Sequence, residues 1–141
     1  PKLNKKNKIY EIASNDGTFL KNFKRNGYSV VGIDPAKNIS KIANENGIKT
    51  LPIFFNTENS DLIKKKFGEG SLVFARNVIP HVENIHSIFG GIKNILNEEG
   101  TLVIEFHYSN KIPDGFLAQW HQIEPRIDVL GPEMVPMLIQ C

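Results

Sequence analysis

The stretch "KIYEIASNDGTFLKNF", Lys8 to Phe23, begins with the pattern of a buried β-strand and ends with that of an amphipathic α-helix. Lys8–Ala13 is short and mostly apolar, whereas Phe19, Leu20 and Phe23 fall on one helical face. A short polar turn joins the two. Turns of this kind commonly hold ligands, because the first N–H groups of a helix have no partner within it.

The same alternation continues to about residue 108 and predicts the fold class. Pro52 weakens the third strand, because proline cannot donate a ladder hydrogen bond. Short apolar strands separated by helices indicate an α/β protein with a parallel sheet and helices on both faces. We predict strands at 8–13, 28–34, 48–55, 71–76 and 101–108, and helices at 17–27, 35–47, 60–68 and 82–100.

The composition changes after Lys111. The chain holds 15 asparagines and 14 lysines, and none of either lies in residues 112–141, which hold four of the eight prolines. We expect residues 1–111 to form the core domain and 112–141 a separate irregular segment, either a foreign or out-of-frame tail or a native lobe. We recognise no strand in that segment, so the C-terminal strands of the sheet are expected to be missing.

Charge and cysteine content argue against several classes of function. The net charge is only +2, and four lysines lie within the first eight residues, which predicts a solvated tail rather than a nucleic-acid surface. No apolar run reaches the length of about 18 residues that a spanning helix needs, so no membrane segment is expected. The single cysteine, Cys141, excludes an internal disulfide and a thiolate metal cluster, which fits a cytoplasmic protein without a metal site.

The first turn does not carry a phosphate-binding pattern. The dinucleotide fingerprint G-x-G-x-x-G would require glycine at Ala13, Asn15 and Thr18, and no P-loop pattern occurs in the chain. The pattern [DE]-x-G-x-G-x-G fits better, because it aligns with Glu11, Ala13, Asn15 and Gly17. Alanine is the next smallest residue, and asparagine tolerates left-handed backbone.

Two carboxylates give this turn a chemical preference. Glu11 would attract the ammonium and sulfonium groups of S-adenosyl-L-methionine (SAM), although an exposed strand end or a salt bridge would also explain an acid there. Asp34 ends the second strand, 23 residues later, where adenosine cofactors have their ribose hydroxyls bound. It also fits as a cap for the helix that begins at Pro35, and the two roles are compatible.

"EIASNDGTFL" and "VVGIDP" together resemble the class I SAM-dependent methyltransferases. More narrowly, residues 8–110 are similar to the C-methyltransferases that act on nucleotide-linked deoxysugars, with "FARNVIPHVEN" as a second point of likeness. The resemblance implies a Rossmann-like methyltransferase fold, SAM as cofactor and a small-molecule acceptor such as a keto-sugar nucleotide. In such enzymes a proton leaves the carbon beside the sugar ketone, and the enolate takes the methyl group.

The resemblance also implies roles for individual residues. His81 matches a histidine near the active site, and imidazole exchanges protons readily near neutral pH. A partly exposed loop histidine would fit the sequence equally well. Implied cofactor contacts are Glu11, Ala13, Ser14, Asn15 and Gly17 at the methionine end, Asp34 at the ribose, Pro35 with Phe54 or Phe55 at the adenine, and Arg76 and Asn77 on the methyl-transfer side.

The chain also departs from that family. No cysteine precedes Cys141, where the family has a zinc module, and only Trp120-His121-Gln122 distantly resembles its Tyr-His-Glu-His motif. Two alternatives therefore stay open, a cofactor-binding fragment without catalysis and a nicotinamide-dependent oxidoreductase. The methyl acceptor and the oligomeric state are not indicated.

Overall fold

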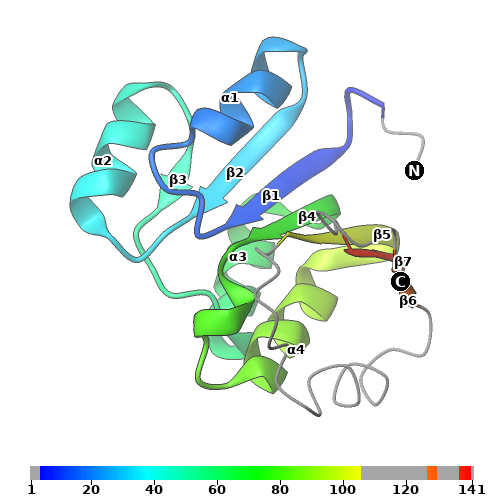
Figure 1. Ribbon diagram of the computed structural model, residues 1–141. Coiled ribbons are helices and arrows are strands. Elements are labelled where there is room, and N and C mark those ends of the chain that lie inside the picture. The colour runs from blue at the N-terminus through cyan, green and yellow to red at the C-terminus, as the bar shows by residue number, and fades with distance from the viewer. Residues whose placement is uncertain (1–3, 106–126, 130–136, 141) are drawn as a thin grey trace.

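The structure, a computed structural model, describes residues 4–105, 127–129 and 137–140. Within these described residues, seven strands form one sheet, and four α-helices pack on its two faces (Figure 1). The strands are β1 (Lys8–Ile12), β2 (Ser29–Ile33), β3 (Thr50–Leu51), β4 (Gly70–Arg76), β5 (Leu96–Glu105), β6 (Ile127–Val129) and β7 (Met137–Gln140). The helices are α1 (Thr18–Arg25), α2 (Lys37–Glu45), α3 (Thr57–Phe67) and α4 (Ile85–Ile95), with a 3-10 turn, η1, at Ile79–His81.

The sheet order is β3-β2-β1-β4-β5-β7-β6, and the first five strands in this order are parallel. The predicted α/β class with a parallel sheet is confirmed. The order reverses between β1 and β4, and in open parallel sheets ligands bind at the carboxyl ends of the strands beside such a reversal. The turn after β1 lies at this point.

The expectation that the C-terminal strands are missing is wrong. β7 runs antiparallel to β5, and β6 pairs antiparallel with β7. These strands are only three and four residues long, and the intervening sequence contains proline, so hydrophobic periodicity does not reveal them. Their pairing depends on the backbone edge that β5 offers rather than on a local pattern.

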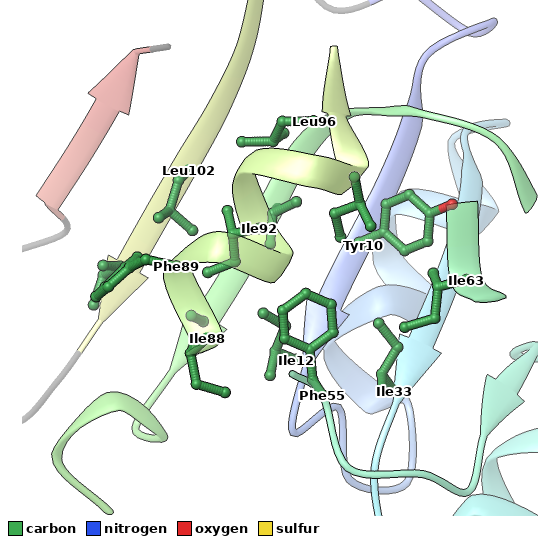
Figure 2. Close-up of a cluster of buried hydrophobic side chains, with 14 of the residues drawn as sticks. Tyr10, Ile12, Ile33, Phe55, Ile63, Ile88, Phe89, Ile92, Leu96 and Leu102 are labelled. Atoms are coloured by element: carbon green, nitrogen blue, oxygen red, sulfur yellow. The ribbon is translucent and has the colours of Figure 1, made fainter. Parts of the chain in front are cut away.

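Each face of the sheet carries its own apolar cluster. Ile9 pairs in register with Val30 and Leu72, and these side chains pack with Leu20 and Ala43 of α1 and α2. Next in the register, Tyr10, Val31 and Val73 face the other side. There they join the cluster of α3 and α4, which Figure 2 shows around Ile12, Phe55, Ile88 and Ile92. Strands buried on both faces explain the continuous apolar runs in the sequence.

Several element boundaries differ from the prediction, most of all those of the third strand and of the last helix. The third strand shrinks from 48–55 to Thr50–Leu51, as Pro52 would favour. The helix predicted over 82–100 ends at Ile95, and Leu96 instead pairs with Gly70 as the start of β5. An irregularity between Gly70 and Leu72 then accommodates three additional residues in β5 before Thr101 resumes the register. Predicted positions 106–108 lie outside the described residues.

Within the described residues, no helix has the length and hydrophobicity needed to cross a membrane.

Candidate functional site

The turn after β1 has left-handed backbone at alternate residues. Ala13, Asn15 and Gly17 have φ angles of 56°, 52° and 78°. These are the three positions at which the [DE]-x-G-x-G-x-G pattern favours glycine, so the chain adopts that backbone although only Gly17 is glycine. A non-glycine residue in this region is disfavoured by roughly 1–2 kcal/mol, with asparagine the best tolerated. The strained turn is therefore held by its surroundings, and such strain concentrates at binding sites.

Hydrogen bonds hold this turn in place. The Ser14 N–H donates to the Ile33 carbonyl of β2 at 3.2 Å, and the Gly17 N–H donates to the Ser14 carbonyl at 3.0 Å. Asp16 accepts from the Thr18 N–H at 3.0 Å, which lowers the pKa of its carboxyl. The first turn of α1 thus receives a carboxylate oxygen, as helix N-termini favour.

Asp34 joins the turn to the end of β2. Its Oδ2 accepts from the Asn15 N–H at 3.0 Å, and its Oδ1 accepts from the Ala36 N–H at 2.9 Å, just before α2. The expectation that Asp34 caps a helix beginning at Pro35 is wrong, because α2 begins at Lys37, its N-cap is Ala36 and no side chain caps it. The bond from Asp34 to the Ala36 N–H instead fixes the turn that precedes the helix. An ionised carboxylate has about four acceptor sites, so two backbone donors leave capacity for further donors.

Glu11 is a buried carboxyl group with one free oxygen. It is 3% exposed, and its Oε2 has no hydrogen-bond partner among the described residues. Burial raises its pKa to about 8, although the guanidinium of Arg76 acts in the opposite direction. The buried Ser14 hydroxyl also has no partner in the described chain. Two such polar atoms are expected where a ligand supplies the missing partners.

Gly32 makes room for this arrangement, and sequence reasoning gave it no role. It pairs in register with Glu11, and a Cβ atom there would overlap the Ser14 hydroxyl and lie 2.8 Å from Thr50 Oγ1. A side chain at Gly32 would therefore displace Ser14 from the turn. The strand pattern alone gave no sign of this close approach.

Arg76 connects Glu11 to the end of β5. Its Nη1 lies 3.5 Å from Glu11 Oε1, and its Nε and Nη2 lie 3.0 and 3.3 Å from the two carboxylate oxygens of Glu105. The guanidinium also lies 4.1 Å from the ring centre of Phe19 in α1. Sequence reasoning gave no role to Phe19 or Glu105, although Glu105 carries the same signal as Glu11, an acid within an apolar strand.

The structure distributes the other predicted residues unequally. Pro35 is exposed and follows Asp34, whereas Phe55 is only 6% exposed and packs in the cluster under α3 and α4. Phe55 is therefore largely inaccessible to a ligand, and its neighbour Phe54, which is 72% exposed, is the accessible aromatic after β3. The structure thus separates the two aromatics between which the sequence could not decide.

Asn77 and His81 follow β4 at the carboxyl edge of the sheet. Asn77 has a φ of 52°, and its N–H donates to the Glu105 carbonyl at 2.6 Å. His81 is exposed at the end of η1, and its N–H donates to the Val78 carbonyl. Trp120 and His121 lie outside the described residues. In the described part of the chain, no three His, Cys, Asp or Glu side chains form a group suited to a metal ion.

Comparison with known proteins agrees with this geometry. Residues 1–129 match the methyltransferase domain family, so the chain belongs to that family. It is also 34% identical over 100 residues to the C-methyltransferase NovU of Streptomyces niveus. That match covers 71% of this chain and 24% of NovU, so the chain matches about a quarter of that relative.

Solved structures show the same fold. A TehB-like SAM-dependent methyltransferase of Corynebacterium glutamicum has a TM-score of 0.73 at 14% identity, covering 99% of this chain and 83% of its own. An O-methyltransferase of a Brevibacillus brevis polyketide multienzyme, solved with S-adenosyl-L-homocysteine, has a TM-score of 0.59 at 18% identity. That match covers 75% of this chain and 37% of the other. The resemblance to class I SAM-dependent methyltransferases is thus confirmed, and SAM is the cofactor that these matches support.

Proposed function

We propose that the chain is the cofactor-binding part of a SAM-dependent C-methyltransferase whose acceptor is a small keto compound such as a keto-sugar nucleotide. The observation that supports it most strongly is the buried Glu11 carboxyl with its unpartnered Oε2, beside a turn fixed by Asp34. The likeness to NovU, which is named a C-methyltransferase, favours carbon as the methylated atom.

The residues present suit this cofactor. Glu11 Oε2 would accept a hydrogen bond from the cofactor's ammonium group. The Ser14 hydroxyl, which has no partner in the described chain, would form its missing hydrogen bond at the same end of the cofactor. Asp34 would receive the ribose hydroxyls with its unused acceptor sites. Phe54 and Pro35, both exposed after neighbouring strands, would contact the adenine. When bound, SAM supplies an electrophilic methyl group on a sulfonium centre.

His81 is the proposed base. It follows the carboxyl end of β4 and is exposed, so an acceptor could reach its imidazole. It would take the proton from the carbon beside the acceptor's ketone, and the resulting enolate carbon is the nucleophile. Asn77, held by the Glu105 carbonyl, fixes the start of the segment that carries His81.

Calorimetric titration of the chain with SAM, S-adenosyl-L-homocysteine and NAD tests the cofactor. We expect binding of the first two and none of NAD; binding of NAD alone would favour an oxidoreductase. Methyl transfer to a 4-keto sugar nucleotide, with His81→Ala and the exposed helical His86→Ala as a matched pair, tests catalysis. SAM binding without turnover would instead support a cofactor-binding fragment that does not catalyse the reaction.

A further inference from the structure

We infer that Arg76 is a positioning residue that acts through Glu11: its guanidinium holds one oxygen of the Glu11 carboxyl, which leaves the other oxygen for the cofactor. This inference depends on the proposed cofactor site. It differs from the sequence-based expectation, in which Arg76 itself contacts the ligand.

The contacts of Arg76 leave its guanidinium little capacity for a ligand. Nε and Nη2 form a two-pronged pair with Glu105 at 3.0 and 3.3 Å, Nη1 faces Glu11, and one face of the plane covers Phe19. An arginine fixed by a planar fork and a ring has a defined orientation. It is therefore suited to support a neighbouring group.

The charges around Glu11 show why it needs support. Glu105 on β5 and Asp16 in the turn are both negative and oppose its ionisation, as burial does. Arg76 on β4 is the one cation that acts on Glu11 within the described residues. Without that cation, a carboxyl group 3% exposed would hold its proton more strongly and would attract a cationic ligand less.

The register explains how the three charged groups meet. Glu11 pairs with Phe74 of β4, Arg76 lies two residues further on the same face, and Arg76 pairs with Glu105. The Phe19 ring packs on Phe74 with ring centres 4.9 Å apart, so α1 covers the cluster from one side. Glu11 Oε1 is directed to Arg76, and Oε2 is the oxygen without a partner.

The direct test needs no cofactor. The Glu11 carboxyl is titrated by carbon NMR in the full chain and in Arg76→Gln, with the exposed Arg25→Gln as control. We expect Arg76→Gln to raise the Glu11 pKa by about one unit or more, a tenfold change in proton affinity, and Arg25→Gln to leave it unchanged. An unchanged Glu11 titration in a folded Arg76→Gln protein would overturn the inference.

A binding cycle supplies the second test. Arg76→Gln should weaken SAM binding at neutral pH by about tenfold, and this loss of affinity should diminish at alkaline pH. In a Glu11→Gln background the same substitution should cause little further loss of affinity. Arg76→Lys, which keeps the positive charge, should retain most of the wild-type affinity. An equal, pH-independent loss in both backgrounds would mean that Arg76 contacts the ligand directly. If no variant and no wild type binds SAM, the proposed function fails while the NMR result still stands.

A separate observation supports a second inference, at the opposite edge of the sheet. A hollow of about 380 Å³ opens at the amino ends of β1 and β2. It exists because β3 pairs only with Gly32 and Ile33, which leaves Ser29–Val31 without a strand on that side in the described chain. Its lining includes Lys8, Lys24, Lys49, Lys66, Tyr28 and Phe67 and no acidic residue.

We propose that this hollow binds a small ligand with two or more phosphate groups. Lys24 and Lys66 lie in the last turns of α1 and α3, where helix dipoles favour cations. Lys8 begins β1 and Lys49 precedes β3, so no helix dipole accounts for either. None of the four has an ion-pair partner among the described residues. Lys49 and Lys66 both lie over Phe67, at 5.6 and 5.4 Å from its ring centre, so one ring gathers two ammonium groups.

Calorimetry with pyrophosphate and with ADP tests this site. We expect the double variant Lys49→Glu/Lys66→Glu to lose at least about tenfold in affinity, whereas Lys41→Glu/Lys65→Glu, with the same charge change outside the hollow, keeps it. Tighter ADP binding would identify a nucleotide, and equal binding an inorganic polyphosphate. No pyrophosphate binding, or equal loss in both double variants, would overturn the proposal.

Discussion

The Asp34 carboxylate accepts a hydrogen bond from the Asn15 N–H at 3.0 Å, and this bond joins the end of β2 to the strained turn after β1. The same carboxylate accepts from the Ala36 N–H ahead of α2. One side chain therefore fixes the relative positions of two turns at the carboxyl edge of the sheet. A site that binds both ends of an adenosyl cofactor requires this rigidity.

Removal of this carboxylate should weaken both stability and cofactor binding. Asp34→Ala leaves two backbone N–H groups without an acceptor, which should lower the free energy of unfolding by about 1–3 kcal/mol. The affinity for SAM should fall as well. Asp34→Asn keeps one acceptor oxygen, so its stability and its SAM affinity should lie between those of the wild type and of Asp34→Ala. Denaturant unfolding and calorimetry measure the two effects. Unchanged SAM affinity in Asp34→Ala would refute the ribose assignment.

Ala13→Gly should stabilise the protein. Ala13 has a φ of 56°, where glycine lacks the steric penalty of a Cβ atom, so relief of about 1 kcal/mol is expected. Thermal unfolding measures the change. The control is the buried Ala43→Gly within α2, where the same replacement should destabilise. A loss of stability in both variants would show that the Ala13 methyl group contributes packing that outweighs its backbone strain.

Glu11 should make the ligand-free protein less stable as pH rises. Its pKa is about 8 in the folded chain, against an ordinary 4.5. Between these values the folded protein retains a proton that the unfolded chain has released, so the free energy of unfolding decreases with rising pH. Glu11→Gln cannot titrate and should show a flatter profile between about pH 5 and 8 than the wild type. The exposed Glu83→Gln serves as control, and an equal change of slope in both variants would contradict the assignment to Glu11.

Gly32→Ala should destabilise the turn. The added methyl group would overlap the Ser14 hydroxyl and approach Thr50 Oγ1, and such overpacking typically lowers stability by about 1–3 kcal/mol. Because Ser14 Oγ is the nearest atom, Ser14→Ala should recover part of the loss in the double variant. Urea unfolding of the two single variants and the double variant measures this. Strict additivity of the two changes would show that Ser14 is not the atom in conflict.

Local patterns predicted most of the fold and directed attention to the turn after β1. Apolar strands separated by helices are continuous signals, and an acid at Glu11 or Asp34 stands out against them. Arg76, Glu105 and Gly32 act through partners that lie 18 to 65 positions away in the chain. No periodicity reports such partners, because they meet only when neighbouring strands adopt a shared register.

β6 and β7 escaped prediction for a related reason. Each is too short to show a period, and each forms because a neighbouring backbone edge is available. For Phe54 and Phe55 the sequence offered two equivalent candidates, because both are aromatic and they are adjacent. Only the exposed fraction of each side chain, which the sequence does not give, distinguishes them.

The alternation of side chains along β4 has a consequence for how this site can change. Arg76 lies on the face covered by α1, whereas Ala75 faces the cluster of α4. Insertion of one residue between them would turn the Arg76 guanidinium toward the apolar cluster. The carboxylates of Glu11 and Glu105 would then lose their contacts with it. The length of β4 is therefore constrained: the strand can change by substitution but not by insertion or deletion of a single residue.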